Sequence, residues 1–187
     1  MSKVYTIFVI CLFCSISSAQ VKDEEPTEKD FYMEGSLRLS FGKQTRIGIS
    51  PAINYQLTPK LSLGTGVIAE YYSSTTSENS TFSTSIYGVN LIADYKISRL
   101  GQILNPRTTL SLHAEQEFLN YETQYFDDEI DNGRSWTNVS LLGLKVKRKI
   151  GTKNRFALSL IAVWNLNNNS VANSLYNNPV IKLGFQF

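Results

Sequence analysis

The chain has 187 residues, with 18 Lys and Arg against 16 Asp and Glu, a formal net charge of +2 and a single histidine. This balance is too weak to predict a nucleic-acid surface. The two cysteines, Cys11 and Cys14, lie near the amino terminus, so the rest of the chain offers no thiol, disulfide or Cys-ligated metal site.

Residues 1–19 have the pattern of a secretory signal peptide. Lys3 supplies a positive charge, residues 4–16 form an apolar run, and Ser17-Ser18-Ala19 is a small-residue cleavage site. The apolar run is shorter than the roughly 20 residues that a membrane-spanning helix needs. A lipid anchor on Cys14 is disfavoured because the residue before it is the bulky Phe13.

Residues 20–30 follow as a charged leader, which we expect to be solvated and periplasmic, and residues 31–187 form one domain. No segment of the mature chain has helical periodicity, and none has 18 consecutive apolar residues, so it could enter a membrane only as strands. Eight segments have the length and pattern of β-strands: 31–41, 46–57, 60–72, 81–97, 107–121, 136–149, 154–166 and 179–187.

Apolar and polar residues alternate within these segments. In the last segment Ile181, Leu183, Phe185 and Phe187 share one face, whereas Lys182 lies on the other. A soluble secreted β-sandwich or barrel would turn the apolar faces inward, and a membrane barrel would turn them outward. Alternation alone fits both.

Three further features favour the membrane barrel. Tight connections at 58–59 and 151–153 alternate with long polar ones at 73–80, 122–135 and 167–178, although 42–45 is short and 98–106 is longer than the pattern requires. An even strand number returns the carboxy terminus to the side where the mature chain starts. Aromatic residues gather near the strand ends, as two interfacial belts would: Tyr71, Tyr72, Tyr121, Tyr125, Trp136, Trp164 and Tyr176 at the long-loop ends, and Tyr55, Tyr95, Phe156 and Phe187 at the tight-turn ends.

The strand-turn-strand segment 48–64 and the closing strand that ends on Phe187 resemble small eight-stranded bacterial outer-membrane proteins of the OmpA/OmpX type. The resemblance implies an all-β, eight-stranded antiparallel up-and-down transmembrane barrel in the outer membrane, with short periplasmic turns and longer external loops. It also implies contact with outer-membrane lipid and lipopolysaccharide, and recognition of Phe187 by the barrel-assembly machinery. Pro51 departs from a smooth strand ladder, so we expect a bulge or a strand end there.

A resemblance of this kind carries little about activity. We expect a monomeric, non-enzymatic envelope scaffold whose surface loops make the external contacts, without cofactor or nucleic acid. The alternatives are a narrow channel or uptake barrel, a lipid-modifying barrel enzyme, and a soluble secreted β-barrel. His113 and Glu115 are the nearest approach to a catalytic pair. A barrel-embedded lipid A deacylase uses His-x-Ser on its outer surface, whereas here Glu replaces Ser and both side chains are predicted to point inward.

Strand parity predicts a charged barrel interior. Eight strands enclose a space that side chains fill, so these charges should pair with one another and with trapped water, and a wide pore is not expected. The residues predicted to point inward are Glu34, Arg38, Glu70, Asp94, Lys96, Glu115, Glu117, Lys145, Lys147 and Lys182.

Three other motifs have simple interpretations. The acidic segment 127–133 lacks the ligand spacing of an EF-hand and is predicted to be a solvated external loop. Lys147-Arg148-Lys149 lies at a tight-turn end, where long cationic side chains reach the interface. Gly64-Thr65-Gly66 is followed by no helix and no lysine, so it is not a nucleotide loop. We therefore predict no catalytic, cofactor-binding or metal-binding residues.

Overall fold

A computed structural model describes residues 31–40, 44–75, 81–97, 107–126, 133–151, 156–167, 170–176 and 178–187. The predicted signal peptide and leader, with both cysteines, lie outside these ranges. The strands are β1 Phe31–Ser40, β2 Gln44–Gln56, β3 Leu61–Thr75, β4 Thr81–Lys96, β5 Thr108–Glu122, β6 Arg134–Ile150, β7 Phe156–Asn165 and β8 Val180–Gln186, with a 3-10 turn η1 at Thr123–Tyr125 and a short helix α3 at Ser170–Leu175.

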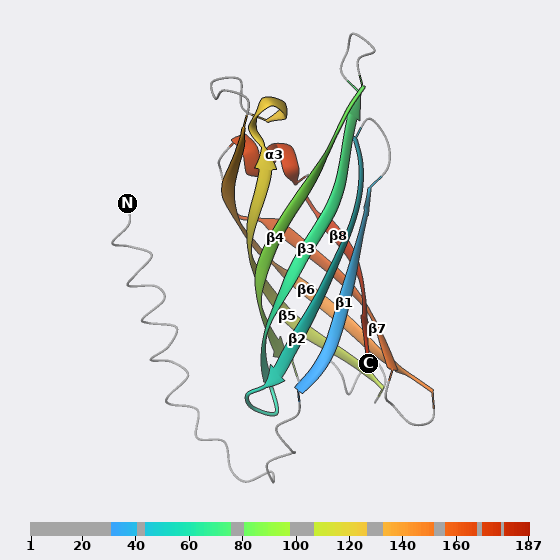
Figure 1. Cartoon of the computed structure of the whole chain (residues 1–187). Coiled ribbons are helices and arrows are strands. Elements are labelled where there is room, and N and C mark those ends of the chain that lie inside the picture. Colours follow the sequence, from blue (N-terminus) through green and yellow to red (C-terminus); the bar gives the residue numbers. More distant parts are fainter. Residues whose placement is uncertain are drawn as a thin grey trace, which may run out of the picture.

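The strands form one closed barrel in the order β1 to β8, which confirms the predicted all-β, eight-stranded antiparallel up-and-down barrel (Figure 1). Each strand pairs antiparallel with the next, and β8 closes the barrel by pairing Glu34–Arg38 of β1 with 182–186. The closure extends to the last residue, because the Phe187 backbone N–H donates to the Met33 carbonyl at 3.1 Å. Closure leaves no free sheet edge in the barrel.

The outside of the barrel, here called the outer wall, is apolar. Leu91 is 55% exposed and Leu183 51%, while their neighbours Asn90 and Lys182 are 1% and 2% exposed. The same alternation places Leu112 outside and His113 inside on β5. The predicted faces are therefore confirmed, with the apolar face turned outward as it would be in a membrane barrel and not in a soluble one.

Aromatic side chains lie on the outer wall near both ends. Tyr71, Trp136 and Trp164 are exposed toward the long-loop end, and Tyr95 and Phe187 toward the tight-turn end. The prediction was wrong for Tyr72, Tyr121 and Tyr176, which are 2%, 4% and 2% exposed and point into the barrel. Tyr72 follows the outward-facing Tyr71 directly, so parity turns it inward. Strand parity therefore predicts the direction of these aromatic side chains better than their nearness to a strand end does.

Pro51 lies within β2 without ending it. Pairing with β3 passes from Ile49↔Ala69 to Ala52↔Gly66 with unchanged register, and pairing with β1 continues through Gly35↔Pro51. The expected bulge or strand end is therefore absent; the ladder to β3 is merely interrupted for two residues. Gly66 makes room, since a Cβ at that position would lie 2.5 Å from the Pro51 carbonyl oxygen.

The turn at Thr58-Pro59 is as tight as predicted. The Leu57 amide donates to the Leu61 carbonyl at 2.9 Å, and the Leu61 amide donates to the Thr58 hydroxyl oxygen at 2.9 Å. At the second tight turn, Gly151 has φ +83°, a conformation that suits glycine.

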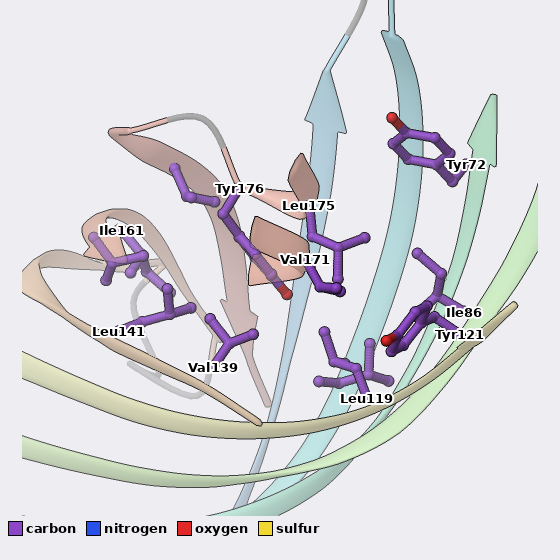
Figure 2. Close-up of a cluster of buried hydrophobic side chains, with 13 residues drawn as sticks. Tyr72, Ile86, Leu119, Tyr121, Val139, Leu141, Ile161, Val171, Leu175 and Tyr176 are labelled. Carbon is purple, nitrogen blue, oxygen red and sulfur yellow. The ribbon is translucent and has the colours of Figure 1, made fainter. Parts of the chain in front are cut away.

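The segment 167–178, predicted to be an external loop, contains α3 and folds back into the barrel mouth. Val171, Leu175 and Tyr176 are buried there at the long-loop end (Figures 1 and 2). The helix has only six residues and lies in a segment without helical periodicity. Within the described ranges, no helix is long and apolar enough to span a membrane.

Candidate functional site

The barrel interior contains a continuous series of buried ion pairs, here called the ion-pair chain. Its members alternate in sign if His113 carries a proton. In contact order they are Glu34, Lys145, Asp94, His113, Glu115, Lys182, Glu117, Arg38, Glu70 and Arg46. They come from β1, β2, β3, β4, β5, β6 and β8, so only barrel closure brings them together.

The half of the ion-pair chain nearer the tight-turn end is centred on His113. Its Nδ1 lies 2.6 Å from Asp94 Oδ1, and its Nε2 lies 3.4 Å from Glu115 Oε2. Lys145 Nζ lies 2.9 Å from Asp94 Oδ2 and 2.5 Å from Glu34 Oε1. Both ring nitrogens of the histidine are thus engaged by carboxylates inside the barrel.

The other half of the ion-pair chain extends toward β2 and β3, which contribute Arg46 and Glu70. Lys182 Nζ bridges Glu115 Oε2 at 2.6 Å and Glu117 Oε1 at 2.8 Å. Arg38 donates to Glu117 at 2.7 Å and also to Glu70, which in turn accepts from Arg46. Glu117 and Glu70 therefore each have two cationic partners, which offsets the large cost of burying these carboxylates.

The long-loop end of the interior is filled by an apolar cluster, here called the apolar cap (Figure 2). The strands contribute the wall of the cap, including Ile86, Leu119 and Val139, each with 0% exposure. Helix α3 and the residue after it contribute Val171, Leu175 and Tyr176, which fill the mouth. The apolar cap thereby covers the ion-pair chain on the long-loop side.

Tyr176 joins the apolar cap to the ion-pair chain. Its hydroxyl accepts from Arg38 at 2.8 Å and donates to Glu117, and the guanidinium carbons of Arg38 and Arg46 each lie 4.7 Å from its ring centroid. Burial raises the pKa of the Tyr176 phenol well above its ordinary value, so the hydroxyl keeps its proton and remains a donor.

Asparagine side chains fix the segment around α3 to the barrel rim. Asn167 Oδ1 accepts from the Ser140 amide at 2.6 Å, and its Nδ2 donates to the Asn138 carbonyl at 3.1 Å. Asn178 Oδ1 accepts from the Asn165 amide at 2.7 Å. The backbone pairing of β6 with β7 ends at Leu141↔Asn165, and these side-chain amides supply hydrogen bonds beyond that point. The segment is therefore bound to the rim on both sides of α3.

The predicted inward charges are confirmed for most positions, including Glu34, Asp94 and Lys182. Lys147 is half-buried near the tight-turn end, where its Nζ lies 3.1 Å from Gln186 Oε1. Lys96 is exposed, contrary to expectation, because it is the last residue of β4 and the barrel opens there.

Arg46 and Tyr176, which bind members of the ion-pair chain, were not among the residues predicted to point inward. Arg46 has the same parity as Gly48, which is buried, so the alternation along β2 predicts that Arg46 points inward. Tyr176 follows α3 and is not on a strand, so strand parity cannot predict the direction of its side chain.

His113 is buried and hydrogen-bonded inside the barrel, as predicted. Its side-chain partners among the described residues are Asp94 and Glu115. A small pocket beside it is lined by Glu34, Ser36, Ser50 and Lys145, and belongs to the same interior. No group of three or more His, Cys, Asp or Glu residues in the described ranges is arranged to hold a metal ion. Residues 127–132 of the acidic segment lie outside those ranges.

No protein-family model matches the sequence, and neither does any curated protein. Among solved structures, the chain is similar to the N-terminal β-barrel domain of Pseudomonas aeruginosa OprF. The two share 14% sequence identity over 84% of this chain and 95% of that domain, with a TM-score of 0.45.

Proposed function

We propose that this chain is a bacterial outer-membrane barrel that acts as a non-enzymatic envelope scaffold. The observation that carries the proposal is the outer wall, where large apolar side chains are exposed on strand after strand of a closed barrel with a charged interior. An apolar surface of this extent is unfavourable in water and favourable against lipid.

The filled interior supports a scaffold over a channel. The ion-pair chain occupies the middle of the barrel, and the apolar cap closes its long-loop end. An ion would have to separate buried pairs and displace α3, so we expect the purified barrel to give no discrete conductance steps in planar bilayers.

The position of His113 supports a non-enzymatic role. Its side chain is 2% exposed and both ring nitrogens are engaged by carboxylates inside the barrel, away from lipid substrates. We expect purified wild-type protein and His113→Ala to be equally inactive on lipid A and phospholipids. Activity that disappears in the variant would replace the scaffold by an enzyme.

Fractionation tests the proposed location. A lipid-embedded barrel should stay in the membrane pellet after carbonate extraction, and its migration on a denaturing gel should change with heating. Release by carbonate, or recovery from the periplasm without detergent, would show instead a soluble secreted barrel.

Phe187 is the proposed contact with the assembly machinery. Phe187 is 67% exposed on the outer wall, and its ring centroid lies 5.7 Å from that of Phe156. Deleting Phe187 or adding a charged tail should reduce membrane assembly far more than the burial of one phenylalanine, about 1.5–3 kcal/mol, would explain. Phe156→Ala is the matched control, since it removes the neighbouring ring and keeps the terminus. Equal yields from the deletion and the control would contradict this role.

A further inference from the structure

The outer wall of β5 and β6 differs from the rest of the barrel. Gln116, Asn120 and Glu122 on β5, with Arg134, Asn138 and Ser140 on β6, have the parity of the outward-facing Leu112 and Leu142. We call these six residues the polar stripe. Between the aromatic levels of the other described strands, the outward side chains are apolar apart from Thr65, whose hydroxyl donates to the Asn90 carbonyl at 3.0 Å.

The polar stripe is an ordered, cross-strand arrangement. Gln116 is registered with Ser140, and Glu122 with Arg134. The Ser140 hydroxyl donates to Gln116 Oε1 at 2.6 Å, and Arg134 Nη1 donates to Glu122 Oε1 at 3.0 Å. Asn138 is exposed and lies between these two rungs opposite Phe118, while Asn120 lies opposite Trp136, so the stripe includes two outward aromatic side chains.

Part of the polar stripe lies below the aromatic level: Gln116, Asn138 and Ser140 lie below it, Asn120 lies at it, and Glu122 and Arg134 lie above it. Trp136, 65% exposed, marks that level on β6, and Ser140 lies four residues further down the strand. Four residues at about 3.3 Å each, on a strand tilted by about 40°, descend roughly 10 Å. On the proposed location, Gln116, Asn138 and Ser140 would therefore face the apolar region of the bilayer. Gln116 and Ser140 are bonded to each other, and Gln116 Nε2 also donates to the Val139 carbonyl at 3.2 Å, whereas the Asn138 side chain is exposed. An exposed amide at this depth is costly unless another polar surface covers it.

The chemistry of the polar stripe fits a second copy of this chain. Two copies in one membrane share their orientation, so a two-fold axis runs along the membrane normal. A residue on this axis meets its own copy, and residues beside the axis meet other residues of the stripe at the same depth. Amides and hydroxyls both donate and accept, so Gln, Asn and Ser can each pair with themselves. Arg134 and Glu122 share a rung and can exchange partners between copies.

We propose that the polar stripe is the interface of a symmetric homodimer, with β5 and β6 of the two barrels in contact. The inference rests on the proposed membrane location and replaces the monomer expected from the sequence. A lipid phosphate is the less suitable occupant, because the single cation of the stripe, Arg134, is already balanced by Glu122.

Disulfide cross-linking in native membranes tests the contact. Asn138→Cys should form a disulfide-linked dimer of this chain under mild oxidation. Val67→Cys, on the outer wall of β3 and 56% exposed, is the matched control and should stay monomeric. The wild-type chain controls for Cys11 and Cys14. No dimer from Asn138→Cys, an equal yield from Val67→Cys, or a product with a different protein would overturn the proposal.

A second variant keeps the test independent of thiol geometry. Gln116→Leu, Asn138→Leu and Ser140→Ala together make this wall like the others, so the barrel should still fold and change its gel migration on heating. Sedimentation equilibrium in detergent should show loss of the dimer that the wild type forms. A wild-type monomer, or a variant that stays dimeric, would contradict the interface. Membrane-bound protein without the dimer refutes this inference alone, whereas protein found in the soluble fraction refutes the proposed function as well.

Discussion

The ion-pair chain and the apolar cap fill the same barrel interior by different means. Every member of the ion-pair chain is on a strand, and each is aimed inward by the two-residue alternation of that strand. The apolar cap is completed by Val171, Leu175 and Tyr176, which reach the interior because a loop folds back. We infer that the ion-pair chain is part of the barrel framework, whereas the cap can be altered without disturbing the framework.

Removing one charge from the ion-pair chain should have the largest effect. Lys182→Met leaves Glu115 and Glu117 without the ammonium that lies between them, and a buried charge deprived of its partner typically costs about 3–5 kcal/mol. Urea unfolding of the detergent-reconstituted barrel measures the loss. Lys96→Met is the matched control, and because Lys96 is exposed we expect a change within about 0.5 kcal/mol.

The same variant reports on the interior's hydration. If water reaches these carboxylates, the cost of Lys182→Met should fall below about 1 kcal/mol, as it does for solvent-exposed pairs. Such a result would contradict the inference that the ion-pair chain is shielded from water, but it would not contradict the barrel fold.

Truncation in the apolar cap should have an intermediate effect. Leu175 is 1% exposed, and buried Leu→Ala changes cost about 2–5 kcal/mol. We expect the lower end of that range, because a mouth helix can settle into the space. The loss should be local, so amide exchange should accelerate in 170–176 and stay slow in β5. Asn173→Ala, on the exposed side of α3, is the control. Accelerated exchange throughout β5 would mean that the cap belongs to the framework.

The smallest effect should come from the link between the two regions. Tyr176→Phe keeps the ring between Arg38 and Arg46 but removes the hydroxyl that binds Arg38 and Glu117. Because Arg38 and Glu117 keep each other and their further ion partners, we expect a loss of about 1 kcal/mol, the usual net value of one hydrogen bond. A double-mutant cycle with Glu117→Gln isolates the contact. Strict additivity would indicate that the cap and the ion-pair chain are energetically independent.

The sequence predicted the framework because its rule is local. Alternation in β5 and β8 was enough to place Glu115, Glu117 and Lys182 inside the barrel, and closure then brought them together. The same rule would have placed Arg46 and Tyr72 inside had it been applied up to the strand ends.

The cap could not be predicted in this way. Helix α3 has six residues, too few for a helical period to emerge from an Asn-rich segment. Its position depends on rim contacts such as Asn167 with Ser140, which exist only after β6 and β7 have paired. The polarity of the segment suggested solvent exposure, whereas the amides are used to bind the rim.

The most direct test of the account uses the two native tryptophans. Trp136 and Trp164 are 65% and 45% exposed on the outer wall near the long-loop end. In bilayers of brominated phospholipid, both should be quenched strongly, with bromines near the headgroup more effective than those near the bilayer centre. Water-soluble acrylamide should quench them weakly. Efficient quenching by acrylamide with none by brominated lipid would contradict an apolar wall in contact with the membrane.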